Sequence, residues 1–178
     1  MEFYNFNVKD VAGNDVPLKN YEGKVVLVVN IATKCGLTPQ LEGLEKLYKE
    51  YNSKGLEIIG FPCNQFLEQA PEDNKQINEF CSVNYGVTFK NFAKIDVNGE
   101  TADPLYKFLK KAKTSDTPNE GTEDFINLLK NEYSQDFPGS EIKWNFGKFL
   151  IDRNGKVADR FSPTFTPDEL KKEIEKYL

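Results

Sequence analysis

The feature that most constrains the fold is a run of consecutive apolar residues, 25–29, that leads directly into a short polar turn. A continuous apolar run of this length is typical of a buried strand. The turn holds Cys35, and a helical pattern begins at once behind it, with Thr38 as the expected N-cap and Pro39 as the first helical residue. A thiol in this position faces the unpaired N–H groups and the positive dipole end of the helix, which favour the thiolate. Because the thiolate is the nucleophilic form, Cys35 is the expected reacting residue.

The rest of the chain alternates strand-like and helix-like segments. The apolar patterns predict strands at 3–8, 16–18, 25–32, 56–61, 92–97, 148–152 and 156–161. They predict helices from Pro39, around Ile77 and Cys81, over 104–112, and behind Thr166. This order predicts an α/β fold, in which a central mixed sheet carries helices on both faces and follows a short N-terminal β-hairpin. Ligands of such sheets meet the turns at the strand ends, which is where Cys35 lies.

The length of 178 residues suits a single domain, 1–178. Residues 113–141 interrupt the alternating pattern, because they are rich in polar residues, Pro and Gly and contain only a short helical patch near Phe125, Leu128 and Leu129. We interpret this segment as a surface insertion. Its amphipathic patch either covers the protein's own sheet or forms an interface, and we expect a homo-oligomer built through it.

Several classes of protein are excluded by what the sequence lacks. The chain has no histidine, which excludes Cys/His and Ser/His/Asp hydrolases and His-ligated metals. Its three cysteines are too widely spaced for a zinc or iron–sulfur motif, and no glycine-rich nucleotide-binding motif occurs. A net charge of -5 with interspersed signs argues against nucleic acid. No signal peptide or membrane span is recognisable, so we expect a cytoplasmic protein with reduced thiols and no cofactor.

Three motifs stand out in order along the chain. They are residues 29–36, Val-Asn-Ile-Ala-Thr-Lys-Cys-Gly, residues 60–66, Gly-Phe-Pro-Cys-Asn-Gln-Phe, and residues 142–151, Ile-Lys-Trp-Asn-Phe-Gly-Lys-Phe-Leu-Ile. The first resembles the strand and turn of the peroxide-reacting site of the glutathione peroxidase family, and the other two resemble the second and third signatures of that family. The resemblance covers the whole chain and implies a thioredoxin-like fold. The second motif departs from the family at Leu67 and Ala70, where the family usually has glycine and glutamate.

The resemblance implies a role at each of four positions. Cys35 matches the residue that attacks peroxide, which is selenocysteine in some members and cysteine in others. Gln69 matches the active-site glutamine, and Trp144 and Asn145 match the remaining members of the family's tetrad. An indole N–H and two amides are neutral hydrogen-bond donors, which can hold a thiolate and the oxygens of hydrogen peroxide or an organic hydroperoxide without a histidine.

Cys81 lies in a stretch, 80–87, that resembles the one holding the resolving cysteine of thioredoxin-dependent members. On this resemblance, peroxide oxidises Cys35 to a sulfenic acid, Cys81 closes a disulfide with it, and thioredoxin reduces the disulfide. Cys63 directly follows a strand and a proline, and we expect it to be a small buried apolar residue.

Two alternatives stay open. Cys81 shares a helical face with Ile77 and Phe80, so it can be a core residue of a one-thiol peroxidase that uses glutathione. A protein of another class, a peroxide sensor that passes its disulfide to a partner protein, needs the same two cysteines.

Overall fold

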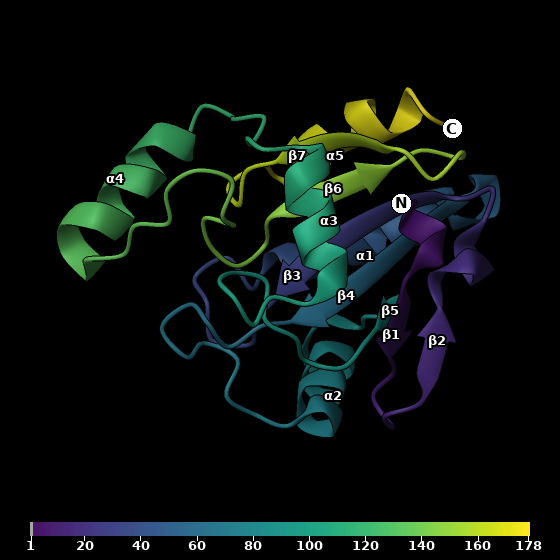
Figure 1. The fold of residues 1–178 in the computed structure, drawn as a ribbon, viewed down its shortest axis with the longest axis horizontal. Helices are drawn as coiled ribbons and strands as arrows, with labels where there is room; N and C mark the ends of the chain where they lie inside the picture. Colours follow the sequence, from purple (N-terminus) through teal and green to yellow (C-terminus); the bar gives the residue numbers. More distant parts are fainter. Residues whose placement is uncertain (1) are drawn as a thin grey trace.

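A five-stranded mixed sheet forms the centre of the molecule, with the strand order β5-β4-β3-β6-β7 (Figure 1). The structure is a computed structural model that describes residues 2–178. β3 pairs in parallel with β4, and β4 with β5, whereas β6 is antiparallel to both β3 and β7. The strands are β3 (Val25–Ile31), β4 (Leu56–Pro62), β5 (Lys90–Asn91), β6 (Lys148–Ile151) and β7 (Val157–Phe161).

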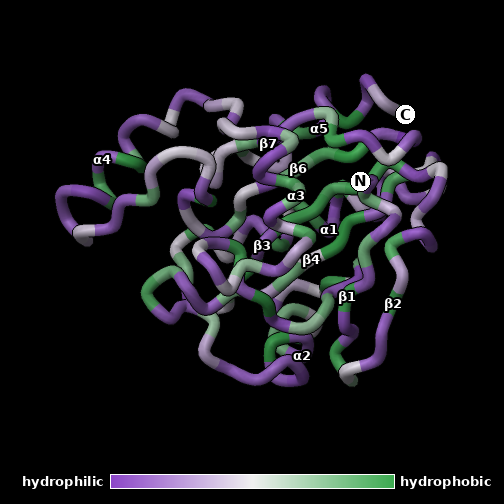
Figure 2. Tube along the Cα trace, in the orientation of Figure 1, coloured by the Kyte–Doolittle hydropathy of each residue, from purple (hydrophilic) through white to green (hydrophobic). Residues whose placement is uncertain are grey.

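The central strand β3 is buried along its whole length. Its apolar side chains point to both faces, which is the pattern of a strand covered by helices on each side. Figure 2 shows the same distribution, with the hydrophobic trace concentrated along β4 and β6 in the middle of the molecule. The apolar run 25–29 therefore forms the predicted buried strand.

Helices cover both faces of the sheet, which confirms the predicted α/β class. In Figure 1, α3 lies in front of the sheet and α1 behind it, where α1 packs against α5. On the α3 side, the ring of Tyr106 packs edge-on against Phe61 and Phe149. No helix among residues 2–178 has both the length and the hydropathy needed to cross a membrane. The helices are α1 (Gln40–Tyr51), α2 (Asn74–Tyr85), α3 (Pro104–Ala112), α4 (Thr122–Tyr133) and α5 (Pro167–Glu175).

The N-terminal segment differs from its prediction. Instead of a strand over 3–8, the chain forms a 3-10 turn, η1 (Phe3–Asn5), followed by β1 (Asn7–Lys9), which pairs with β2 (Asp15–Pro17). The reason is local, because the side chain of Asn5 accepts a hydrogen bond from the backbone N–H of Glu2 at 2.7 Å and closes the turn. The hairpin itself is present. Two further 3-10 turns are η2 (Leu18–Tyr21) and η3 (Asn52–Lys54).

The predicted strand at 92–97 is also wrong. Only Lys90 and Asn91 pair with β4, as the two-residue strand β5. Beyond β5, the N–H groups of Phe92, Ala93 and Ile95 donate in turn to the carbonyls of Gly60, Lys9 and Pro62. Because Gly60 and Pro62 lie on β4 whereas Lys9 lies on β1, no continuous ladder with β4 forms.

The segment 113–141 contains α4, which stands apart from the sheet at one end of the molecule (Figure 1). The helical patch that the sequence predicts near Phe125 is therefore a helix of 12 residues, which corresponds to roughly three turns at about 3.6 residues per turn. Its neighbours are the loops at the end of the sheet where β3 and β4 finish.

Candidate active site

Cys35 lies in the turn between β3 and α1. Its backbone N–H donates to Oγ1 of Thr38 at 3.1 Å, and the Thr38 hydroxyl donates to the carbonyl of Ala32 at 2.9 Å. The backbone N–H of Leu37 donates to the Cys35 sulfur at 3.3 Å. Thr38 therefore closes the turn rather than capping the helix, and α1 begins one residue later than predicted, at Gln40, with Pro39 in the N-cap position.

Gln69 reaches this turn from the loop that follows the neighbouring parallel strand β4. Its carbonyl accepts hydrogen bonds from the backbone N–H groups of Thr33 and Lys34, at 3.2 and 2.9 Å. Within the same loop, Leu67 and Glu68 adopt left-handed backbone conformations, with φ of 52° and 53°. Such a conformation costs an L-residue about 1 kcal/mol or more, and glycine would avoid that cost.

Trp144 and Asn145 arrive from the other side, immediately before β6. Asn30 of β3 holds this segment, because its Nδ2 donates to the carbonyl of Trp144 at 3.1 Å and its own carbonyl accepts from the N–H of Phe146 at 2.7 Å. Phe146 has a φ of 68°, so the chain turns sharply behind the two site residues. The Trp144 ring packs against Phe66.

The four side chains named by the resemblance meet at one end of the sheet. Nδ2 of Asn145 donates to Oε1 of Gln69 at 3.0 Å. Hydrogen bonds from the side chains of Asn145 and Trp144 to the Cys35 sulfur oppose the rise that burial causes in its pKa. Cys35, Gln69 and Trp144 together line a cavity of about 320 Å³. The fold thus assembles residues that lie more than a hundred positions apart in the sequence.

Burial raises the pKa of the Cys35 thiol above its ordinary value, and this effect exceeds the opposing hydrogen bonds. The N–H of Leu37 and the side chains of Asn145 and Trp144 each favour the thiolate, but desolvation disfavours it more. The sequence led us to expect that the helix terminus and the neutral donors of the site would favour the thiolate. The donors do so, but they only partly offset the penalty of desolvating the charge.

The other two cysteines lie away from this cavity, and all three are free thiols. Cys81 is on α2, almost fully buried, and burial raises its pKa to about 11. Cys63 is fully buried at the end of β4, and burial likewise raises its pKa to about 11. The structure therefore brings together Cys35, Gln69, Trp144 and Asn145, but it does not bring Cys81 to Cys35.

Sequence reasoning missed two groups of residues at the site. Asn30 positions Trp144 through its hydrogen bond to the Trp144 carbonyl. The sequence contains an indication of this role, because Asn30 is the single polar residue within the buried run 25–31. Apolar side chains of α4 line the Cys35 cavity, among them Phe125, Leu128 and Tyr133. Nothing local to α4 indicates that its apolar face points toward Cys35, because that depends on how the 113–141 segment folds back toward the loops that carry Cys35 and Leu67.

The fold and the site define a class of protein. A cysteine in the turn behind the central strand β3, with hydrogen-bond donors around its sulfur, suits thiol chemistry, and the fold around it is that of thioredoxin. The fold is shared with a thiol:disulfide interchange protein of the thioredoxin family from Chlorobium tepidum TLS, with a TM-score of 0.61 at 16% identity over 97% of this chain and 92% of that chain.

Within this class, the chain belongs to the glutathione peroxidase family, whose sequence model matches residues 3–110. It is 51% identical to a glutathione peroxidase of Lactococcus lactis subsp. cremoris over 100% of both chains. It is 48% identical to the glutathione peroxidase-like peroxiredoxin 2 of Saccharomyces cerevisiae over 99% of this chain and 96% of that protein. The crystal structure of Trgpx in its apo form superimposes with a TM-score of 0.71 at 37% identity, covering 99% of this chain and 95% of that one.

Proposed function

We propose that the protein reduces hydroperoxides through Cys35. The thiolate attacks the distal oxygen of the hydroperoxide, the O–O bond breaks, and the alkoxide or hydroxide leaves as alcohol or water after taking a proton. Cys35 becomes a sulfenic acid. The observation that carries this proposal is the arrangement around Cys35: Asn145 and Trp144 hydrogen-bond its sulfur, and Gln69 is bonded to Asn145 and lines the same cavity.

The three neutral side chains act at different points of the reaction. Asn145 and Trp144 face the sulfur and stabilise the thiolate against desolvation. Gln69 lines the cavity, where its amide can donate to the leaving oxygen as negative charge develops there. None of these groups titrates near neutral pH, so the thiol–thiolate equilibrium of Cys35 governs the pH dependence.

We further propose that Cys81 resolves the sulfenic acid. Its thiolate attacks the Cys35 sulfur, the S–O bond of the sulfenic acid breaks as the disulfide forms, and hydroxide leaves as water after taking a proton. A dithiol such as thioredoxin then reduces the disulfide. Because Cys81 is buried on α2 and its pKa is raised to about 11, it reacts only after this helix opens. The name of the yeast relative, a peroxiredoxin, supports a cysteine-based peroxidase.

The test is hydroperoxide-dependent NADPH oxidation, coupled in parallel to the thioredoxin system and to the glutathione system. The parent protein is compared with Cys35→Ser, Cys81→Ser and the buried-thiol control Cys63→Ser. We expect turnover with thioredoxin that is lost in Cys35→Ser and Cys81→Ser and retained in Cys63→Ser. Glutathione-dependent turnover that survives Cys81→Ser would instead identify a one-thiol peroxidase. Stoichiometric oxidation of Cys35 without turnover by either reductant would favour the peroxide sensor.

Location and assembly are part of the same proposal. Three free thiols suit a reducing compartment, and we infer a cytoplasmic location. A homo-oligomer through residues 113–141 stays a prediction, which sedimentation of the purified protein tests directly. A single species near the chain mass of 20.4 kDa would contradict it.

A further inference from the structure

The cavity above Cys35 is unusually apolar for a site that needs to bind only a peroxide group. Apart from Cys35, Gly36 and Gln69, its lining consists of apolar or aromatic side chains. Hydrogen peroxide has no apolar part and gains nothing from such walls, whereas an organic hydroperoxide loses apolar surface to them. Trp144 lines the cavity from the segment before β6, Leu37 and Leu67 come from the loops that follow β3 and β4, and α4 supplies Phe125, Leu128, Leu129 and Tyr133.

Exposed apolar residues gather at the mouth of this cavity. Among residues 2–178, the large hydrophobic side chains that remain exposed are Leu67, Leu128, Tyr133 and Val83. The first three line the cavity, with 46, 44 and 53% of their surface accessible to solvent. Exposed apolar surface that is clustered, rather than scattered, marks a binding site.

Leu67 provides a second and independent indication. It adopts a left-handed backbone conformation, with φ of 52°, at a position where glycine would be free of strain. The chain therefore keeps a bulky apolar side chain at a strained position, half exposed, beside the reacting sulfur. Backbone strain that is retained next to a site is a signal of function.

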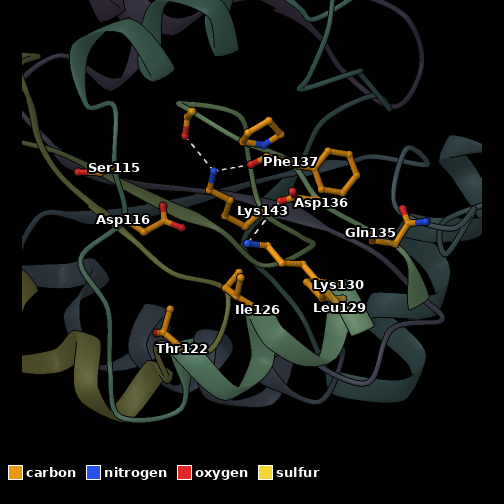
Figure 3. Close-up of a pocket in the computed structure, with 12 residues that line it drawn as sticks. Ser115, Asp116, Thr122, Ile126, Leu129, Lys130, Gln135, Asp136, Phe137 and Lys143 are labelled. Carbon is orange, nitrogen blue, oxygen red and sulfur yellow. Dashed lines mark hydrogen bonds and ion pairs between the residues drawn. The ribbon is translucent and has the colours of Figure 1, made fainter. Parts of the chain in front are cut away.

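Helix α4 has free space on both of its sides. Within α4, residues 122–133, Leu129 is the only buried residue. Behind it lies a second cavity of about 370 Å³, which Figure 3 shows between α4 and the loop that carries Lys143. Ile126 and Lys130 of α4 face that second cavity, while Phe125 and Leu128 face Cys35. Helix α4 thus separates the Cys35 cavity from the second cavity. The second cavity leaves space into which α4 can shift when a larger group binds beside Cys35.

We propose that α4 and Leu67 form a subsite for the organic group of the hydroperoxide, and that this subsite makes hydroperoxides with a bulky apolar group better substrates than hydrogen peroxide. The inference rests on the proposed peroxidase function of Cys35. Leu67, Leu128 and Tyr133 determine specificity without touching the peroxide oxygens. The organic group that they bind takes no part in the bonds formed and broken at Cys35.

The test follows the oxidation of Cys35 alone, without any reductant. Trp144 is the single tryptophan of the chain and lies at the site, so its fluorescence in a stopped-flow instrument reports the reaction of Cys35. The second-order rate constants for cumene hydroperoxide and hydrogen peroxide are measured for the parent protein, Leu67→Gly, Leu128→Ala and the double variant. Ile126→Ala is the matched control, because it shortens an apolar side chain of the same helix on the side away from Cys35.

We expect the ratio of the two rate constants, cumene hydroperoxide over hydrogen peroxide, to fall about tenfold in the double variant and to stay unchanged in Ile126→Ala. The rate with hydrogen peroxide should change little in every variant. An unchanged ratio overturns the inference, and so does an equal loss with both substrates, which would show that α4 only supports the fold of the site. An unchanged ratio together with a raised KM for thioredoxin, measured in the coupled NADPH assay, would also overturn it, since the surface would then bind the reductant. Failure of the parent protein to react with either peroxide would instead reject the proposed function.

Discussion

Asn145 donates a hydrogen bond from its side-chain amide to Oε1 of Gln69 across 3.0 Å, although the two residues belong to loops at the ends of different strands. This bond fixes the orientation of the Gln69 amide. Because its oxygen is turned toward Asn145, its NH₂ group is left as the donor for a peroxide bound in the cavity that Gln69 lines.

Replacing Gln69 with leucine should slow the oxidation of Cys35 by hydrogen peroxide about 10²-fold, as expected when one donor to a developing negative charge is removed. The Trp144 fluorescence assay measures this rate, and thermal unfolding checks that the variant folds. Leucine has nearly the volume of glutamine, so packing changes little. A rate within about twofold of the parent protein would show that Gln69 holds only Asn145 in place.

The pH dependence follows from the raised pKa of Cys35. The protonated thiol is neutral and the thiolate is charged, so burial favours the thiol and leaves a small thiolate fraction at neutral pH. The rate of Cys35 oxidation should therefore rise steadily with pH and level off only above the ordinary range for thiols, around pH 8.5. Rates between about pH 6 and about pH 10 measure this.

The variant Asn145→Leu sharpens the same prediction. It removes a side chain that lowers the pKa of Cys35, so the rise of the rate should move to still higher pH, with a correspondingly lower rate at pH 7. The rate constant of the fully formed thiolate, read at high pH, should change less than the rate at pH 7. A plateau already present below neutral pH in the parent protein would contradict the raised pKa.

Local patterns predicted most of the fold. The buried run 25–29, the hairpin of β6 and β7, and the capping box of Thr166 with Glu169 at α5 are all encoded within a few residues. The predicted strand at 92–97 does not form, because the N–H groups of this segment donate to the carbonyls of Gly60, Lys9 and Pro62, which only the complete fold brings alongside. Patterns within a segment cannot show which distant groups will compete for its hydrogen bonds.

The site divides in the same way. Its four side chains were found through motifs, but the support of Trp144 by Asn30 and the placement of α4 over Cys35 are contacts between distant segments. The left-handed backbone at Leu67 was hidden for a different reason. A leucine gives no local sign of positive φ, and only the departure from the family's glycine marked the position.

Leu67 offers a stability prediction that separates backbone strain from packing. Leu67→Gly should change the free energy of unfolding by less than about 1 kcal/mol, because the relief of a strained φ offsets the lost apolar contact. Leu128→Gly is a matched control with nearly the same exposure, 44% against 46%, but within a helix. It should cost about 1 kcal/mol more through helix propensity alone. Equal losses in urea unfolding would show that Leu67 is not strained.

Arg160 ties both ends of the 113–141 segment to β7. Its guanidinium is almost fully buried and donates to Oδ1 of Asp116 at 2.6 Å. The same group donates to the carbonyls of Lys113 at 3.0 Å, Ser140 at 2.8 Å and Glu141 at 2.9 Å. The segment that carries α4 over Cys35 therefore begins and ends at one side chain.

Replacing Arg160 with leucine leaves Asp116 and these carbonyls without their donor. A buried charge that loses its partner costs about 3–5 kcal/mol, so we expect a loss of this size in the free energy of unfolding measured with urea. The control is Arg153→Leu, the other arginine of the chain, which is exposed and donates to the carbonyls of Gly23 and Lys54. The loss of the Arg153 side chain should lower the free energy of unfolding by about 1 kcal/mol.

Because Glu141 lies just before Trp144, Arg160→Leu should also shift Trp144 fluorescence and expose α4 to proteolysis, whereas Arg153→Leu should do neither. If the two variants lose equal stability and α4 resists protease in both, Arg160 does not hold the segment.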